Sequence, residues 1–325
     1  MFIFIILSCF SCGDRSSHEA SATIRECGFL LDRPSLRPQW AVSFGDDDYG
    51  TWAEFSVAVG QKKVMHLMRW IPPGEFLMGS CKKGLSVVGL DHSPAFLSQR
   101  AVRVEAGFWI GETSCTQELW AAVMGDNPSW HADSPQSPLF PVESVNHEMV
   151  QNFLLRLSQL VPGLNPVLPT EKQWEYAARA GETGSFSLFP VNTETINCRP
   201  FIGDVFIRNG RFRGAPVIVR SLPPNSRGLF EVHGNVWEMC SDVFDKGYVL
   251  VDSNDQNAVG GEGYKYVVRG GAWSVEGLYC TLGTRSFISS RGVSDDVGFR
   301  IVSLAPGPDT PSDTTTPSQP PEPTP

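Results

Sequence analysis

Cysteine offers this chain the most chemistry, because a thiolate is both a nucleophile and a soft metal ligand. The eight cysteines are Cys9, Cys12, Cys27, Cys81, Cys115, Cys198, Cys240 and Cys280. No pair among the last six has zinc-site spacing, and the six histidines show neither H-x-x-x-H nor H-x-H spacing, which argues against non-haem iron. A chain of 325 residues can bury a large enough core to fold without disulfide bonds, so we favour buried thiols for these six cysteines. Disulfide bonds remain the alternative.

The composition indicates a packed globular body with many turns. Hydrophobic residues make up 41% of the chain and charged residues 19%. The 31 glycines and 25 prolines favour turns over long helices. A formal net charge of −9, without any basic stripe, argues against a nucleic acid as the partner.

The two ends of the chain differ from its middle. Residues 1–12 form a short apolar run that resembles a bacterial lipoprotein signal, with Cys12 as the first choice for lipidation and Cys9 as the second. The run lacks a preceding Lys or Arg, so a mis-assigned start or a buried N-terminal strand is the alternative. Residues 13–26 are polar and predict a flexible tether, and the Pro/Thr-rich residues 305–325 predict a disordered tail. We therefore expect a protein of the bacterial cell envelope, lipid-anchored to a membrane and exposed on the outer surface.

The middle of the chain predicts a single α+β domain over residues 27–304 with much irregular structure. Three helices are expected, at 116–124, 146–160 and 170–180, where capping residues precede apolar stripes. Short apolar runs at 68–71 and 75–79 are typical of strands. There is no internal repeat, G-x-G-x-x-G motif or P-loop.

Five stretches resemble the formylglycine-generating-enzyme/sulfatase-modifying-factor domain family. They are 68–80, 115–129, 141–154 with 168–181, 228–242 and 267–302. They occur in the family's order and cover most of residues 50–303. The resemblance implies a C-type-lectin-like fold of the formylglycine-generating-enzyme type, with two main helices, small antiparallel sheets and bound calcium, and with residues 27–64 as an N-terminal extension.

The resemblance also allows the family's chemistry to be tested residue by residue. The oxidase members bind copper through two cysteines five residues apart; the later one matches Cys280, but the earlier one falls on Val275. One thiolate beside a valine cannot hold Cu(I), and Tyr279 and Thr281 add no second ligand or base. We therefore expect no copper and no oxidase activity. An exported oxidase or maturation factor is the alternative.

Calcium is the one cofactor that the resemblance implies for this chain. The matching ligand positions are Glu231, Gly234, Val236 and Glu238. The first is usually Asn in the family, yet Glu keeps an oxygen ligand. The family's second calcium site is not preserved, because Arg211 stands where an acid is expected. The alternative for the 231–238 loop is a simple turn.

Residues 274–297 are the segment from which we predict function. Arg269-Gly270-Gly271 with Trp273 on one side, and Gly298-Phe299-Arg300 on the other, bracket a stretch with neither strand alternation nor helical spacing. Its small polar residues and few aromatics are typical of adaptable contact surfaces. A subset of the family diversifies this segment through retroelements, whose randomised codons cannot encode Lys, Gln, Glu, Met or Trp. These five residue types should fill roughly a fifth of an ordinary segment. In this segment only Glu276 is one of them.

We therefore expect a binding surface for a variable protein or glycan ligand on a rigid scaffold. Leu278, Tyr279, Phe287 and Ile288 are the expected apolar anchors. The expected ligand-binding residues are Ala272, Ser274, Val275, Gly277, Leu278, Tyr279, Thr281, Leu282, Thr284, Phe287, Ile288, Ser289, Ser290, Val293, Ser294, Asp295 and Asp296. Cys280, Arg285 and Arg291 would be scaffold. An ordinary loop between two strands, or a structural envelope protein without a specific ligand, are the other interpretations.

Overall fold

The computed structural model describes residues 37–79, 99–187, 192, 194–200, 212–244 and 264–304, all within one compact unit. The expected signal with Cys12, the tether and the tail lie outside the described residues, as do Cys27, Cys81 and Arg211. No helix of the described part is long and apolar enough to cross a membrane.

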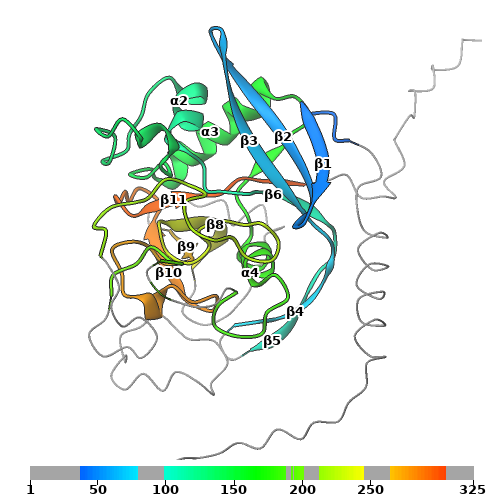
Figure 1. The fold of residues 1–325 in the computed structure, drawn as a ribbon, viewed down its shortest axis with the longest axis vertical. Helices are drawn as coiled ribbons and strands as arrows, with labels where there is room; N and C mark the ends of the chain where they lie inside the picture. The colour runs from blue at the N-terminus through cyan, green and yellow to red at the C-terminus, as the bar shows by residue number, and fades with distance from the viewer. Residues whose placement is uncertain are drawn as a thin grey trace, which may run out of the picture. The chain divides into compact units, whose positions relative to one another are not determined.

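The described chain is α+β, as the sequence predicts (Figure 1). Its α-helices are α2 (Gln117–Met124), α3 (His147–Leu160) and α4 (Glu171–Arg179). Its strands are β1 (Ser43–Asp47), β2 (Gly50–Val59), β3 (Lys62–Ile71), β4 (Gly74–Met78), β5 (Arg100–Val104), β6 (Phe108–Gly111), β7 (Pro166–Val167), β8 (Trp237–Val243), β9 (Lys265–Arg269), β10 (Arg285–Ser289), β11 (Val297–Phe299) and β12 (Val302–Leu304). Short 3-10 turns occupy Ser137–Leu139 and Gly277–Tyr279.

The largest sheet has six strands in the order β1-β2-β3-β6-β12-β7. β2 and β3 form a long antiparallel hairpin that extends past α2 and α3 (Figure 1). Ala53, Phe55 and Val57 alternate along β2 and are buried, which is the pattern of a strand with one face on a core. The hairpin thus belongs to the domain core, in agreement with the expected N-terminal extension.

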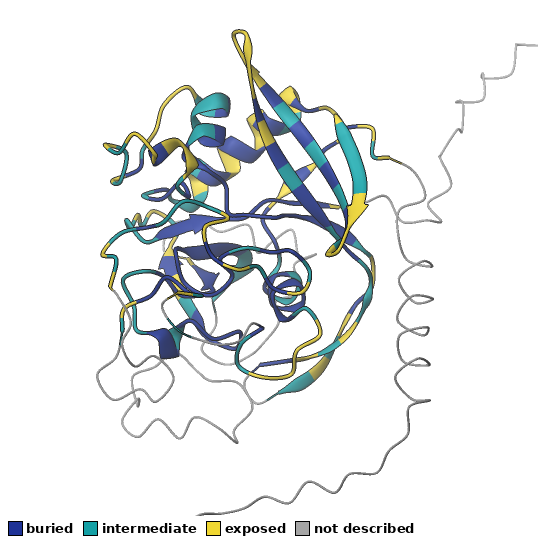
Figure 2. Ribbon diagram, in the orientation of Figure 1, coloured by how far each residue is buried: buried dark blue, intermediate teal, exposed yellow. Residues whose placement is uncertain are grey.

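A second sheet, in the order β10-β9-β8-β11, contains both ends of the 274–297 segment. β9 ends at Arg269, shortly before the segment, and β11 begins at Val297, the segment's last residue. β11 runs parallel to β8, while β9 and β10 pair antiparallel with Phe287 opposite Val267. The two central strands, β8 and β9, are mostly buried (Figure 2), so the segment leaves from a central strand and returns at the edge strand β11.

The three helices begin where the sequence predicts them to begin. Thr116, Asn146 and Thr170 each accept a hydrogen bond from a backbone N–H of the first turn. α2 ends at the left-handed Gly125. α2 packs against α3 and against the β2–β3 hairpin, and α4 packs against β4, β5, β8 and β9. The family resemblance implied two main helices, and the described chain has a third because α2 is capped at both ends.

The interior of the 274–297 segment is more regular than its sequence indicates. The Gly277–Tyr279 turn and strand β10 lie within it. Burial does not alternate along β10: Arg285 and Ile288, on opposite faces of the strand, are both buried, while Phe287 and Ser289 are exposed. A strand forms without the alternating pattern, because Arg285 is buried by an ion pair with Glu171 and the backbone pairs with β9.

Candidate functional site

Two glycines turn the chain at the start of the 274–297 segment. Gly270 and Gly271 have φ values of 94° and 81°, a region that L side chains rarely adopt. A Cβ on Gly271 would lie 2.5 Å from the Sγ atom of Cys280, and one on Gly270 would lie 3.0 Å from the Trp174 ring. The two glycines therefore let the segment double back tightly onto itself and onto α4.

Two buried arginines hold the middle of the segment against α4. Arg269 donates to the carbonyl oxygen of Leu282 at 2.8 Å, to that of Thr284, and to the carboxylate of Glu175. Arg285 donates to both carboxylate oxygens of Glu171, with Nη2 to Oε2 at 2.8 Å. A planar guanidinium group suits this role, because it donates several hydrogen bonds in fixed directions to carbonyl and carboxylate oxygens. Residues 280–285 are thus scaffold, as expected for Arg285.

A third buried arginine, Arg300, follows the segment in the sequence and pairs with a carboxylate of β8. Arg300 donates to both carboxylate oxygens of Glu238, with Nη2 to Oε1 at 2.8 Å. The same Glu238 accepts from Ser114 Oγ at 2.6 Å and from Trp174 Nε1 at 2.7 Å. Arg300 also reaches the carbonyl oxygens of Gly111, Glu112 and Phe230. Every oxygen of this carboxylate therefore has protein donors.

The expected calcium ligands meet donors rather than an open cation site. Glu231 accepts from the backbone N–H groups of Arg220 at 3.1 Å and Leu222 at 3.2 Å, and Glu238 is paired with Arg300. Burial raises the pKa of Glu231 to about 7, which disfavours the ionised form that calcium requires. As these side chains lie, they do not fit a calcium ion, and no step below involves one.

Gly234, which the resemblance assigns to calcium, has another evident role. A Cβ there would lie 2.2 Å from the carbonyl oxygen of Asn197, and the Gly234 N–H donates to the Gly270 carbonyl at 2.8 Å. The glycine therefore allows three backbone segments to meet at the base of the candidate surface. Val236 is buried beside it.

Seven of the expected ligand-binding residues are buried and cannot touch a ligand directly (Figure 2). They are Ala272, Gly277, Leu278, Thr281, Leu282, Thr284 and Ile288. Because they are buried, the prediction of direct contact was wrong for them. The expected residues that are exposed or half-buried are Ser274, Val275, Tyr279, Phe287, Ser289, Ser290, Val293, Ser294, Asp295 and Asp296.

The four expected apolar anchors divide in the same way. Leu278 and Ile288 are each 8% exposed and belong to the core, whereas Phe287 is 39% exposed. The Phe287 ring packs 4.9 Å from the ring of Phe244, and Lys265 Nζ lies 4.0 Å from its centroid. Phe287 is therefore held in place while one face stays open to solvent, as a rigid anchor requires.

An aromatic group that the sequence did not single out lies beside the segment. Trp130 is 76% exposed, and the neighbouring His131 ring meets the Trp273 ring edge-on at 5.5 Å. Phe212 packs on the other side at 6.2 Å and is 48% exposed. Trp273 Nε1 donates to the carbonyl oxygen of Asp295 at 3.3 Å, which ties the group to the segment. The candidate surface is thus wider than residues 274–297.

Cys280, the residue that matches a copper ligand, is fully buried. A hydrogen bond with the thiol of Cys198, together with burial, raises its pKa well above the usual range. Val275 packs against the same small cluster. A thiol held in its neutral form is a poor nucleophile. The expectation that no second ligand lies near Cys280 was wrong, because folding brings Cys198 to it.

His233 fixes the far side of this cluster. Its Nδ1 atom lies 2.8 Å from the Cys280 carbonyl oxygen, and its Nε2 accepts from the Ser187 N–H at 3.0 Å. Burial lowers the pKa of His233 to about 4. The ring is therefore neutral at pH 7, and both of its nitrogen atoms are hydrogen-bonded to backbone groups.

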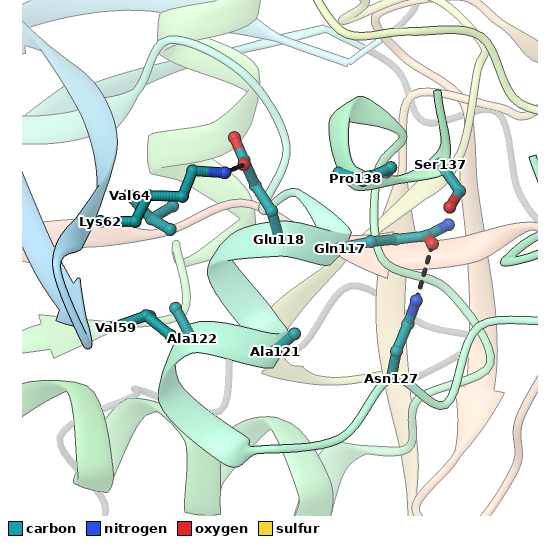
Figure 3. Close-up of a pocket in the computed structure, with 10 residues that line it drawn as sticks. All are labelled: Val59, Lys62, Val64, Gln117, Glu118, Ala121, Ala122, Asn127, Ser137 and Pro138. Carbon is teal, nitrogen blue, oxygen red and sulfur yellow. Dashed lines mark hydrogen bonds and ion pairs between the residues drawn. The ribbon is translucent and has the colours of Figure 1, made fainter. Parts of the chain in front are cut away.

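A hollow of about 290 Å³ lies between the β2–β3 hairpin and α2 (Figure 3). Lys62 and Glu118 form an ion pair at 3.2 Å on one side of it, and Asn127 donates to Gln117 at 2.9 Å on the other. Apart from Ser137, its remaining lining is apolar, from Val59, Val64, Ala121, Ala122 and Pro138. These residues offer neither a nucleophile nor a pair of acids, so the hollow is not the candidate site.

Comparison with known proteins assigns the family. The model of the sulfatase-modifying factor enzyme 1-like domain matches residues 54–305, which is most of the chain and includes the whole 274–297 segment. The chain belongs to this family. Its C-type-lectin-like fold is shared with the solved structure of Treponema denticola variable protein 1, with a TM-score of 0.58 and 23% identity over 78% of this chain and 99% of that one.

The curated relatives of this sulfatase-modifying-factor-like domain include both active and inactive proteins. The formylglycine-generating enzyme of Streptomyces coelicolor is 34% identical over 150 residues, which is 42% of this chain and 46% of the enzyme. The inactive C-alpha-formylglycine-generating enzyme 2 of Mus musculus is 27% identical over 148 residues, which is 42% of this chain and 43% of that protein. The matches span less than half of these relatives' length, so membership of the family does not by itself assign an activity.

Proposed function

We propose that this protein is a surface-displayed lipoprotein that binds a protein or glycan ligand through the outward residues of the 274–297 segment. The observation that carries the proposal is the division of this segment into two sets. Arg269 and Arg285 tie residues 282–285 to buried carboxylates of α4, whereas the side chains of Phe287, Ser289 and Val293 are exposed. Outward side chains can therefore change while the backbone that presents them stays fixed.

Rigid presentation favours binding, because little conformational entropy is lost when the ligand arrives. Phe287 and Tyr279 supply apolar contact area, and Ser274, Ser289 and Ser294 surround them with adaptable hydrogen-bonding groups. Trp130 and Phe212 extend the same surface with further exposed aromatic area. Asp295 and Asp296 add negative charge at its edge, which suits a ligand that carries donors or cations.

The opposing proposal, an exported oxidase, requires a reactive thiol. The Cys280 thiol is buried, its pKa is raised, and Val275 occupies the position of the second copper ligand. We therefore propose that the protein is not an enzyme of the formylglycine-generating type. Oxygen consumption with a cysteine-containing peptide, measured with and without added copper, tests this; turnover that depends on Cys280 would establish the oxidase.

Sequencing the gene and its neighbourhood tests the binding proposal. A near-repeat of the 274–297 coding segment, differing at adenines and lying beside a reverse transcriptase gene, is the expected result. The differences should fall on codons of outward residues such as Ser274, Tyr279 and Phe287, and spare those of inward residues such as Leu282 and Arg285. A single invariant copy of the segment would count against diversification.

A further inference from the structure

Cys198 and Cys280 are 82 positions apart in the sequence and meet in the core. Both are fully buried free thiols that share one small cluster with Ile196. Cys280 Sγ also lies 3.9 Å from the carbonyl oxygens of Ala272 and Glu276. The other two cysteines of the described chain, Cys115 and Cys240, belong to two separate clusters.

The backbone on the Cys198 side is held against the 274–297 segment. The Arg199 N–H donates to the Val275 carbonyl at 2.7 Å, and the Gly277 N–H donates to the Arg199 carbonyl at 3.2 Å. Arg199 and Glu276 form a parallel bridge. These bonds fix the backbone beside Cys198 against the turn that leads into Cys280, so the two segments stay together.

The opposite flank of Cys198 is fixed as well. The Asn235 N–H donates to the Asn197 carbonyl at 2.8 Å, and Asn197 forms a parallel bridge with Gly234. A disulfide needs Cα atoms within roughly 7 Å of each other and side chains that point together. Both cysteines are free thiols in this structure, and their side chains enter one small buried cluster between backbone segments that are already joined by hydrogen bonds, which is the placement such a bond needs.

We propose that Cys198 and Cys280 form a disulfide bond when the chain folds in an oxidising compartment, and that this bond staples the base of the ligand-binding segment. Each thiol loses its proton, one S–S bond forms, and a disulfide-class oxidant accepts the two electrons and leaves as two thiols. Because both sulfurs are buried in the folded protein, oxidation takes place before this region packs. The same burial then shields the bond from reductants.

This inference goes beyond the proposed function and does not depend on the identity of any ligand. The bond would close a loop of about 80 residues, which constrains the unfolded chain strongly. Its location matters more than its strength. It joins the 196–199 segment to the residue that follows the 277–279 turn, and thus fixes the turn that carries the half-buried Tyr279.

Peptide mapping of the full chain provides the test. The protein is exported to a bacterial periplasm, or refolded in a glutathione redox buffer, and is then denatured with an alkylating reagent but no reductant. The expected result is a Cys198–Cys280 linked peptide, with Cys115 and Cys240 alkylated. Free, alkylated Cys198 and Cys280 in protein that folds and melts cooperatively would overturn the proposal, as would a link from either one to another cysteine.

A matched pair of variants separates the staple from general core packing. Reduction under conditions that reach the core should lower the Tm of the wild type by several degrees, and Cys198→Ala/Cys280→Ala should show no such response. Cys115→Ala/Cys240→Ala removes the same number of buried thiols and should keep the full response. An equal response in both double variants would overturn the proposal.

Discussion

Arg285 and Glu171 are 114 positions apart in the sequence and form a bidentate ion pair, with Nη2 2.8 Å from Oε2 and Nε 2.5 Å from Oε1. Both side chains are buried, at 6% and 2% exposure. Glu171 lies in the first turn of α4, and Arg285 opens β10. Because Arg269 Nε also lies 3.2 Å from the same carboxylate, one acidic residue orders both the entrance and the middle of the ligand-binding segment.

Removing Arg285 tests this arrangement. Arg285→Met should lower the free energy of unfolding by about 3 kcal/mol, because it takes from a buried carboxylate one of its two cationic partners. Arg285→Lys keeps the charge but loses the bidentate geometry, and should cost less than Arg285→Met. Urea titration followed by tryptophan fluorescence measures both. Wild-type stability in Arg285→Met would mean that β10 is held by strand pairing alone.

The parts of this fold that could be predicted from sequence are those with local signals. Thr116 and Thr170 mark helix starts because capping uses residues three positions away, and collinear motifs identified the family fold. β10 was missed because its burial does not alternate, and the burial of Arg285 depends on Glu171 far away in the chain. The contact of Cys198 with Cys280, and the aromatic group that Trp130 joins, also depend on distant segments and leave no periodic trace.

The division between inward and outward residues predicts two classes of alanine variant. Leu278→Ala and Ile288→Ala should each lower the free energy of unfolding by about 2–4 kcal/mol, because they leave cavities in the core. Phe287→Ala should lower it by less than about 1 kcal/mol and affect ligand binding instead. Thermal or urea unfolding of the three single variants measures the difference. A Phe287→Ala loss as large as that of Ile288→Ala would place Phe287 in the core.

His233 predicts a loss of stability in acid. Its pKa falls to about 4 in the folded protein because of burial, against about 6.5 in the unfolded chain. A depressed folded pKa gives stability that is present above pH 6.5 and lost as the pH falls toward 4, on the order of 3 kcal/mol in total. Burial also lowers the pKa of His66 to about 3 and that of His147 to about 4, so these two residues add to the loss of stability in acid.

His233→Gln isolates the contribution of this ring, since glutamine can hydrogen-bond to the same backbone groups without gaining a proton. Urea unfolding at about pH 7 and about pH 5 should show a smaller difference in the variant than in the wild type. Glu231 acts in the opposite sense, because its pKa is raised to about 7 and its contribution is lost as the pH rises through that value. Equal acid losses in wild type and variant would show that His233 is not protonated on unfolding.

The pairing of Glu238 with Arg300 leads to a prediction about calcium. Excess calcium, compared with EDTA, should leave the Tm unchanged, because protein donors already occupy the Glu238 oxygens. Glu238→Gln should cost about 3 kcal/mol with or without calcium, since it leaves the Arg300 charge buried. Differential scanning calorimetry measures both effects. A calcium-dependent rise in Tm that Glu231→Gln abolishes would instead support the ligand set implied by the family.

The exposed aromatic group predicts that binding extends beyond the 274–297 segment. A library randomised at positions 287, 289 and 293, selected against hen lysozyme as a protein probe, should yield folded binders, because these side chains are exposed. Trp130→Ala in such binders should leave the Tm unchanged, since the side chain is 76% exposed, and should weaken lysozyme binding about tenfold or more. Leu139→Ala, which removes another exposed apolar side chain outside the segment, is the control and should leave affinity unchanged. Equal affinity with and without Trp130 would confine the binding surface to the segment itself. A library that yields only unfolded variants would contradict the proposal that outward residues can change while the scaffold stays folded.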